Sequence, residues 1–191
     1  MGVSFGLQKP ATVAVVNVLT QKVIVYRSIK QLLGNNYKLL NRQRQQKQRL
    51  SHLRHQAQKR ESDNHFGESE LGQYLDRLIA KAIVDIAQTY NVSSIVVPQI
   101  KQIREIIHSE LQAKAQRKIP GYKEGQKQYA KQYRINIHQW SYGRLIDAIK
   151  QAASKIGIAM EQAPQAPQGT PQQQAKNLAI SAYTSRLETV K

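Results

Sequence analysis

The chain begins with Gly2–Leu7 (GVSFGL), Ala11–Val18 (ATVAVVNV) and Lys22–Ser28 (KVIVYRS), three short runs rich in β-branched and other apolar residues. Lys9-Pro10 and Thr20-Gln21 stand between these runs, at spacings typical of hairpin turns. We therefore predict three consecutive antiparallel strands over residues 2–7, 11–18 and 22–28.

A long helical region is expected next. The segment from Asn36 to Arg60 is polar and holds no glycine or proline, with a thin apolar stripe. After Ser62–Gly67, the segment Glu68–Tyr90 has a much stronger apolar face at helical spacing. That face consists of Leu71, Leu75, Leu78, Ile79, Ala82, Ile83 and Ile86. We predict a helical hairpin inserted over residues 36–91, with a basic first helix.

The rest of the chain alternates strand and helix. Ser93–Val97 predicts a short strand closed by Pro98, and residues 157–160 predict a last strand. Helices are expected near 101–116, 126–133, 138–156 and 172–186, with a Pro/Gln loop at 163–169, so that residues 163–191 form a C-terminal loop and helix. This order predicts one α/β domain over residues 1–191, with a mixed sheet like that of the ribonuclease H fold.

Charge narrows the classes of function. The 191 residues include 29 Lys plus Arg and 12 Asp plus Glu, a net charge of +17, and no cysteine. A field of that sign attracts polyanions, and we expect nucleic acid rather than a membrane, because no amphipathic helix pairs a basic face with a Trp/Phe/Leu-rich one. The missing cysteines exclude disulfides, thiolate zinc sites and cysteine nucleophiles. Without a long apolar run or a signal peptide, we expect a soluble, cytoplasmic protein.

The cations are concentrated early in the chain. The first acidic residue is Glu61, and twelve Lys and Arg precede it. A solvated helix usually mixes charges of both signs at i,i+4 spacing, so a helix without acids favours contact with a polyanion. The candidate nucleic-acid-binding residues there are Lys38, Arg42, Arg44, Lys47, Arg49, Arg54, Lys59 and Arg60.

A second basic segment contains Lys123, Lys127, Lys131 and Arg134, interleaved with Tyr122, Tyr129 and Tyr133. The cations are further candidates for nucleic-acid contact. The tyrosines could stack on bases, or they could be core residues of an amphipathic helix.

Several stretches carry a family resemblance. Gly2–Leu7 with Ala11–Val15, Ile95–Pro98, Trp140–Leu145 and Pro171–Ala179 resemble the motifs of the RuvC-like domain found in type V CRISPR effectors and their TnpB relatives. Further stretches resemble the type V-K effectors that accompany CRISPR-associated transposons; these are Gln31–Gly34, Asn41–Gln46, Phe66–Tyr74 and Pro120–Glu124. The resemblance covers essentially the whole chain, which is similar to the C-terminal RuvC portion of longer family members.

The resemblance implies a degenerate active site. RuvC-type nucleases hold two divalent metals between carboxylates, and hard cations require such anionic oxygen ligands. The three corresponding positions here are Ser4, Pro98 and Pro171. Glu105 and Asp147 are the nearest acids expected on helices, and an ordinary surface charge is the favoured interpretation of each. We expect no metal ligands and no catalytic residues.

Zinc binding is not expected either. The paired CxxC zinc ribbon of TnpB relatives is missing. His52 and His55 have a permitted i,i+3 spacing, but their basic surroundings favour a surface role.

The resemblance implies an RNA-guided DNA-targeting module that binds guide RNA and target DNA without cleaving. Its expected partners are an ATPase regulator, an adaptor and a transposase, and no cofactor is expected. Two alternatives stay open: an active metal-dependent nuclease or transposase with displaced ligands, and a truncated remnant that folds but does no targeting.

Overall fold

The computed structural model describes residues 1–6, 9–59, 70–137 and 142–189. Five described strands form one mixed sheet in the order β3-β2-β1-β4-β5. They are β1 (Gly2–Ser4), β2 (Thr12–Asn17), β3 (Lys22–Ser28), β4 (Ser94–Pro98) and β5 (Ala159–Ala163). The β1–β2 and β2–β3 pairs are antiparallel, which confirms the predicted start, whereas β1–β4 and β4–β5 are parallel. The fold is therefore mixed α/β, and β1 and β4 end at the same edge of the sheet.

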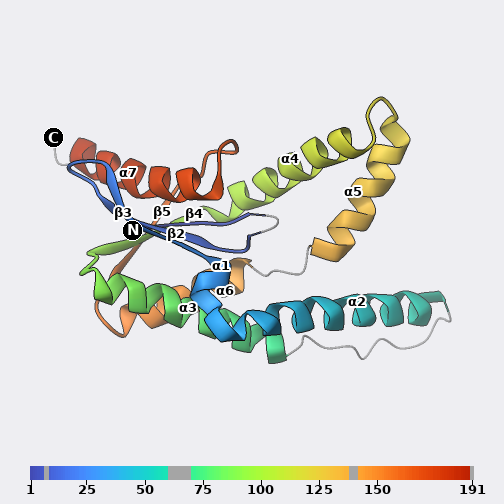
Figure 1. Cartoon of the computed structure of the whole chain (residues 1–191), viewed down its shortest axis with the longest axis horizontal. Coiled ribbons are helices and arrows are strands. Elements are labelled where there is room, and N and C mark those ends of the chain that lie inside the picture. The colour runs from blue at the N-terminus through green and yellow to red at the C-terminus, as the bar shows by residue number, and fades with distance from the viewer. Residues whose placement is uncertain (7–8, 60–69, 138–141, 190–191) are drawn as a thin grey trace.

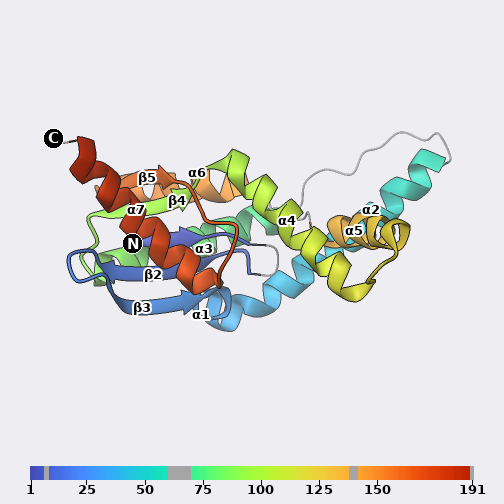
Figure 2. The ribbon, with the colours of Figure 1, turned by 90° about the horizontal axis from the view of Figure 1, so that it is seen from above.

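The helix α7 (Pro171–Thr189) covers one face of the sheet (Figures 1 and 2). Its buried residues are mostly small, including Ala175, Ala179 and Ala182. A Cβ atom on Gly2 of β1 would overlap the Ala175 carbonyl oxygen, so α7 lies directly against the strand backbone. Small residues on both sides permit this close approach.

The opposite face holds the main core. There α1 (Ile29–Leu33), α3 (Glu70–Thr89) and α6 (Tyr142–Ser154) lie beneath the sheet in Figure 1. Leu75, Ile79 and Ile83 of α3 are fully buried with Leu145 and Ile149 of α6. The predicted apolar face of residues 71–86 is thus confirmed, because its other members pack against the same cluster.

Three helices extend from the sheet edge where β1 and β4 end (Figures 1 and 2). After the 3₁₀ turn η1 (Gly34–Asn36), α2 (Tyr37–Lys59) projects away from the sheet. The helix α4 (Ile100–Lys118) leaves the end of β4 and is followed by α5 (Lys123–Ile137), which packs on it. The predicted helices in these ranges are confirmed.

Three expectations need correction. The first strand, predicted over residues 2–7, ends at Ser4. The last strand covers residues 159–163 rather than 157–160, because Gly157, at φ 72°, still belongs to the turn after α6. Its sequence, AMEQA, has little strand preference, so pairing with β4 sets its position. The helix α1 was not expected; its five residues are too few for periodicity to reveal, and the Gln31 side chain accepts a hydrogen bond from the Ser28 backbone N–H at 2.8 Å to cap it.

Candidate nucleic-acid interface

The structure brings together the three positions that the family resemblance aligns with metal-binding carboxylates. Ser4 is the last residue of β1, Pro98 is the last residue of β4, and Pro171 is the first residue of α7. The Ser4 hydroxyl donates a 2.7 Å hydrogen bond to the Pro171 carbonyl oxygen. Because Val96 is paired with Gly2, Pro98 lies level with Ser4 along the parallel strands. The three residues therefore share one sheet edge, although 167 positions separate the first from the last.

A buried glutamine closes this edge. The Gln165 side chain, only 4% exposed, accepts a 3.0 Å hydrogen bond from the Phe5 backbone N–H and donates a 2.7 Å bond to the Phe5 carbonyl. It also donates to Gln174, whose own amide donates to the Ala166 carbonyl at 3.0 Å. A carboxylate could accept from Phe5 but could not donate, so this network requires a neutral amide at position 165.

The residues at this edge do not fit a pair of divalent metals. The hydroxyl of Ser4 is already bonded to a carbonyl, and neither proline has a side-chain ligand atom. Among the described residues, no group of three or more His, Asp or Glu is positioned to hold a metal ion. His52 is exposed on α2 beside the Gln56 amide, and the side chain of His55 lies outside the described set.

A groove beside this edge, about 840 Å³ in volume, carries several cations. We call it the edge groove. It runs from Gly6 and Pro171 to the outer part of α4, and its charged lining residues are Lys9, Glu110, Lys114, Arg117 and Lys118. The acid that lines the groove is Glu110. Glu105 and Asp147 do not line it, and both are exposed on α4 and α6, as the favoured surface interpretation of each predicts. Cations outnumber the acid, so the groove suits phosphate.

Tyr142 anchors the start of α6 to the same edge. Its hydroxyl donates a 2.9 Å hydrogen bond to the Gly6 carbonyl, and its ring lies 5.4 Å from that of Phe5. Burial, and then the Glu110 carboxylate, raise the pKa of Tyr142 far above its ordinary value. The phenol is therefore neutral and serves as a hydrogen-bond donor.

The first basic segment lies on α2. Lys38, Arg42 and Arg49 have exposed side chains. Arg44, Lys47, Arg54 and Lys59 belong to the same helix, but their side chains lie outside the described set, and Arg60 lies outside the described residues. The base of the helix is anchored by Leu40 and Gln43, which are almost fully buried. The described cations of α2 are therefore held away from the core.

The second basic segment lies on α5. Lys123, Lys127 and Lys131 are exposed, whereas the side chains of Arg134 and Tyr133 are outside the described set. Tyr122 is 57% exposed with its ring over Gly125, which excludes a core role for it, and Tyr129 is half-buried. The helices α2 and α5 contact each other, so two basic segments far apart in sequence meet beyond the sheet edge.

Sequence reasoning missed several residues of this edge. Gln165 lies in what the composition indicates only as a Pro/Gln loop, and its partner Phe5 is 160 positions away. Lys114, Arg117 and Lys118 form a basic end to α4, which a count of cations along the predicted helix could have identified. Tyr142 lies within the stretch Trp140–Leu145 noted above, but its hydrogen bond to the Gly6 carbonyl has no local sequence signal.

No protein-family model and no curated protein matches this chain. Among the described residues, no helix combines the length and apolar character needed to span a membrane.

Proposed function

We propose that this chain is a nuclease-dead, ribonuclease H-like domain of the RuvC type that holds nucleic acid without cutting it. The arrangement that this requires, three antiparallel strands followed by two parallel ones, agrees with the sheet. The observation that carries the proposal is the meeting of basic helices α2 and α5 beyond the edge that holds Ser4, Pro98 and Pro171. Cations are gathered where a nuclease would bind its substrate, while the ligand positions lack carboxylates.

The wider role follows from the family resemblance. We propose that the domain works, in the cytoplasm, within an RNA-guided effector, in which base pairing between guide RNA and target DNA supplies sequence recognition. The protein would then contact mainly backbone phosphates. Cutting and joining would belong to a separate transposase, with an ATPase regulator and an adaptor linking it to the effector.

The first test is binding of the chain to an RNA–DNA heteroduplex over a salt series with Mg²⁺ present. We expect log affinity to fall linearly with log salt, and all strands to be intact afterwards on a denaturing gel. Cleavage that stops on chelation, and that Glu110→Gln abolishes, would instead establish a nuclease with a displaced ligand. Absence of binding would establish a remnant.

A charge-matched pair of variants locates the binding surface. The first variant, called the arm variant because α2 projects away from the sheet, carries Lys38→Gln, Arg42→Gln and Arg49→Gln, which neutralise exposed cations of α2. The control variant carries Lys81→Gln, Lys150→Gln and Lys155→Gln, which remove the same charge elsewhere. These exposed lysines lie on α3, on α6 and directly after α6, respectively. We expect the salt slope to fall by about 2–3 in the arm variant, since each lost phosphate contact removes roughly 0.7–0.9. Equal losses in both variants would mean that net charge alone attracts the nucleic acid.

A further inference from the structure

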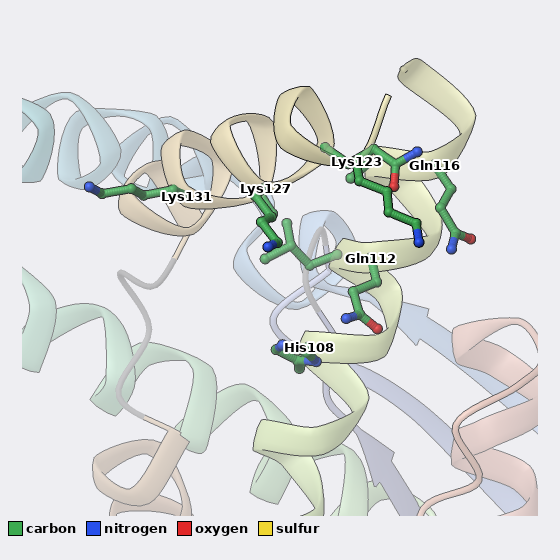
Figure 3. Close-up of a pocket in the computed structure, with 10 residues that line it drawn as sticks. His108, Gln112, Gln116, Lys123, Lys127 and Lys131 are labelled. Carbon is green, nitrogen blue, oxygen red and sulfur yellow. The ribbon is translucent and has the colours of Figure 1, made fainter. Parts of the chain in front are cut away.

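A second groove, about 670 Å³ in volume, lies between α4 and α5 (Figure 3). We call it the α4–α5 groove. It is distinct from the edge groove, which lies against Gly6 and Pro171, and the two grooves share no lining residue.

Two polar rows line its walls. On α5, Lys123, Lys127 and Lys131 recur every four residues and so lie along one face of the helix. On α4, His108, Gln112 and Gln116 recur at the same spacing. Lys123 and Lys127 point toward α4, where Gln112 and Gln116 lie (Figure 3).

The floor between these rows is apolar. Leu111 and Ala115 of α4 are almost fully buried, and Ala130 of α5 is half-buried beside them. A ligand lying along the groove would therefore meet cations on one side, neutral amides and an imidazole on the other, and a small apolar surface between them.

This combination matches the chemistry of a nucleic-acid strand. Lysine ammonium groups only donate hydrogen bonds, so the α5 row suits phosphate oxygens. Successive lysines rise by about 6 Å along the helix axis, which places them in a line rather than a cluster. Glutamine amides both donate and accept, as ribose hydroxyls and base edges do, so the α4 row suits the sugars or bases of the same strand.

The width of the groove selects an unpaired strand. The axes of packed helices lie about 8–10 Å apart, so the groove along their contact is narrower than a helix, whereas a duplex can hold a whole α-helix within its major groove. A duplex could touch exposed side chains on the rim, Gln112 included, but could not lie between the two rows. A single strand is narrow enough to lie between the lysine row and the glutamine row.

We propose that the α4–α5 groove binds the sugar–phosphate backbone of an unpaired nucleic-acid strand, with phosphates on the lysine row and sugars or bases on the glutamine row. This inference rests on the proposed function and assigns to the α4–α5 groove a strand outside the heteroduplex. RNA and DNA strands share this chemistry, and the experiment below separates them.

The test measures binding of the full chain to fluorescein-labelled oligouridine and oligothymidine of equal length, each over a salt series. A groove variant carries Lys123→Gln, Lys127→Gln and Lys131→Gln, and the control variant described above removes the same charge elsewhere. We expect the groove variant to lose about 2 from the salt slope and roughly 100-fold in affinity near 0.1 M salt, since each phosphate contact on a single strand contributes about 0.7. The control variant should retain the wild-type slope.

A second, charge-neutral variant isolates the opposite wall. Gln112→Ala with Gln116→Ala should weaken single-strand binding several-fold without changing the salt slope, because no phosphate contact is lost. Tighter binding of oligouridine than of oligothymidine by the wild-type chain, removed in this variant, would assign the glutamines to the ribose hydroxyl or to the C5 position of the base, the two features that differ. Oligodeoxyuridine, which lacks only the hydroxyl, separates these. Equal loss for both oligonucleotides would assign them to features that the two strands share.

Three results would overturn the inference. The groove variant could match the control variant; the double glutamine variant could bind like the wild type; or the groove variant could lose as much affinity for the heteroduplex as for the single strand. If one of these results is found while the wild-type chain still binds the heteroduplex, the proposed function stands and only the assignment of a single strand to the α4–α5 groove is wrong. If the wild-type chain binds no nucleic acid at all, both proposals fail together.

Discussion

Charged side chains have opposite environments in two regions of the molecule. The first region is the sheet with the helices packed on it, and the second consists of the projecting helices α2 and α5. In the packed region, Asp76 of α3 is 2% exposed and is bonded to Arg144 of α6, and the sheet edge is closed by neutral glutamines. On α2 and α5, the described lysines and arginines of the candidate set are exposed. We therefore expect stability and the proposed nucleic-acid binding to depend on different residues, so that substitutions in one region leave the property of the other nearly unchanged.

The largest expected effect comes from breaking the buried ion pair. Asp76→Ala leaves the Arg144 side chain, which is 24% exposed, without its buried carboxylate partner. We expect a loss of about 3 kcal/mol in the free energy of unfolding, the lower end of the range for buried pairs. Asp147→Ala, at an exposed position on α6, is the matched control and should change stability by less than about 0.5 kcal/mol. Urea denaturation of both variants checks this, and similar values would show that the Asp76–Arg144 pair contributes little.

The amino group of Met1 makes stability depend on pH. Burial lowers its pKa from 8.0 to about 6; Glu161 raises the pKa by a smaller amount, and Arg186 lowers it slightly further. Because the folded state disfavours the ammonium form, unfolding binds a proton between these values, and stability should rise as the pH increases from about 6 to 8. Two pKa units correspond to about 2.7 kcal/mol. Chemical denaturation across this range measures the slope, and acetylation of the same amine should remove this contribution; a slope unchanged by acetylation would show that the Met1 amine does not cause it.

The close approach of α7 to the sheet predicts a loss at Gly2. In Gly2→Ala, the new methyl group would overlap the Ala175 carbonyl and lie 3.0 Å from the Ala179 nitrogen, so α7 must shift. Overpacking of this kind costs about 1–3 kcal/mol. Gly143→Ala places a methyl group where the nearest neighbouring atom is 4.0 Å away and should stabilise α6 slightly. Thermal unfolding distinguishes them, and equal melting temperatures would mean that α7 adjusts without cost.

The same contrast explains what the sequence could reveal. The β-branched runs 12–17 and 22–28 and the apolar periodicity of 71–86 are local signals, and the structure confirms them: β2 is buried along almost its whole length and pairs with β3, and α3 packs its apolar face into the core. The paired Gln165 and Phe5, and the choice of Glu110 over Glu105 at the edge, depend on contacts between distant elements. A local sequence pattern carries no information about such contacts. The basic segments could be identified from the sequence alone, but only the structure shows that α2 and α5 are in contact.

The smallest effect on stability, and one of opposite sign, is expected on α2. Lys38 and Arg42 are four residues apart on one helix, and like charges at this spacing destabilise a helix by about 0.2–0.5 kcal/mol. Arg42→Glu turns this repulsion into attraction, so the chain alone should become more stable by a few tenths of a kcal/mol while its affinity for nucleic acid falls. Denaturation and binding measured on the same preparation test this, with Asp85→Lys on the exposed side of α3 as a control of the opposite charge change. A variant that loses stability together with affinity would show that Arg42 supports the fold, and the separation between a stable sheet and a binding helix would not hold at that residue.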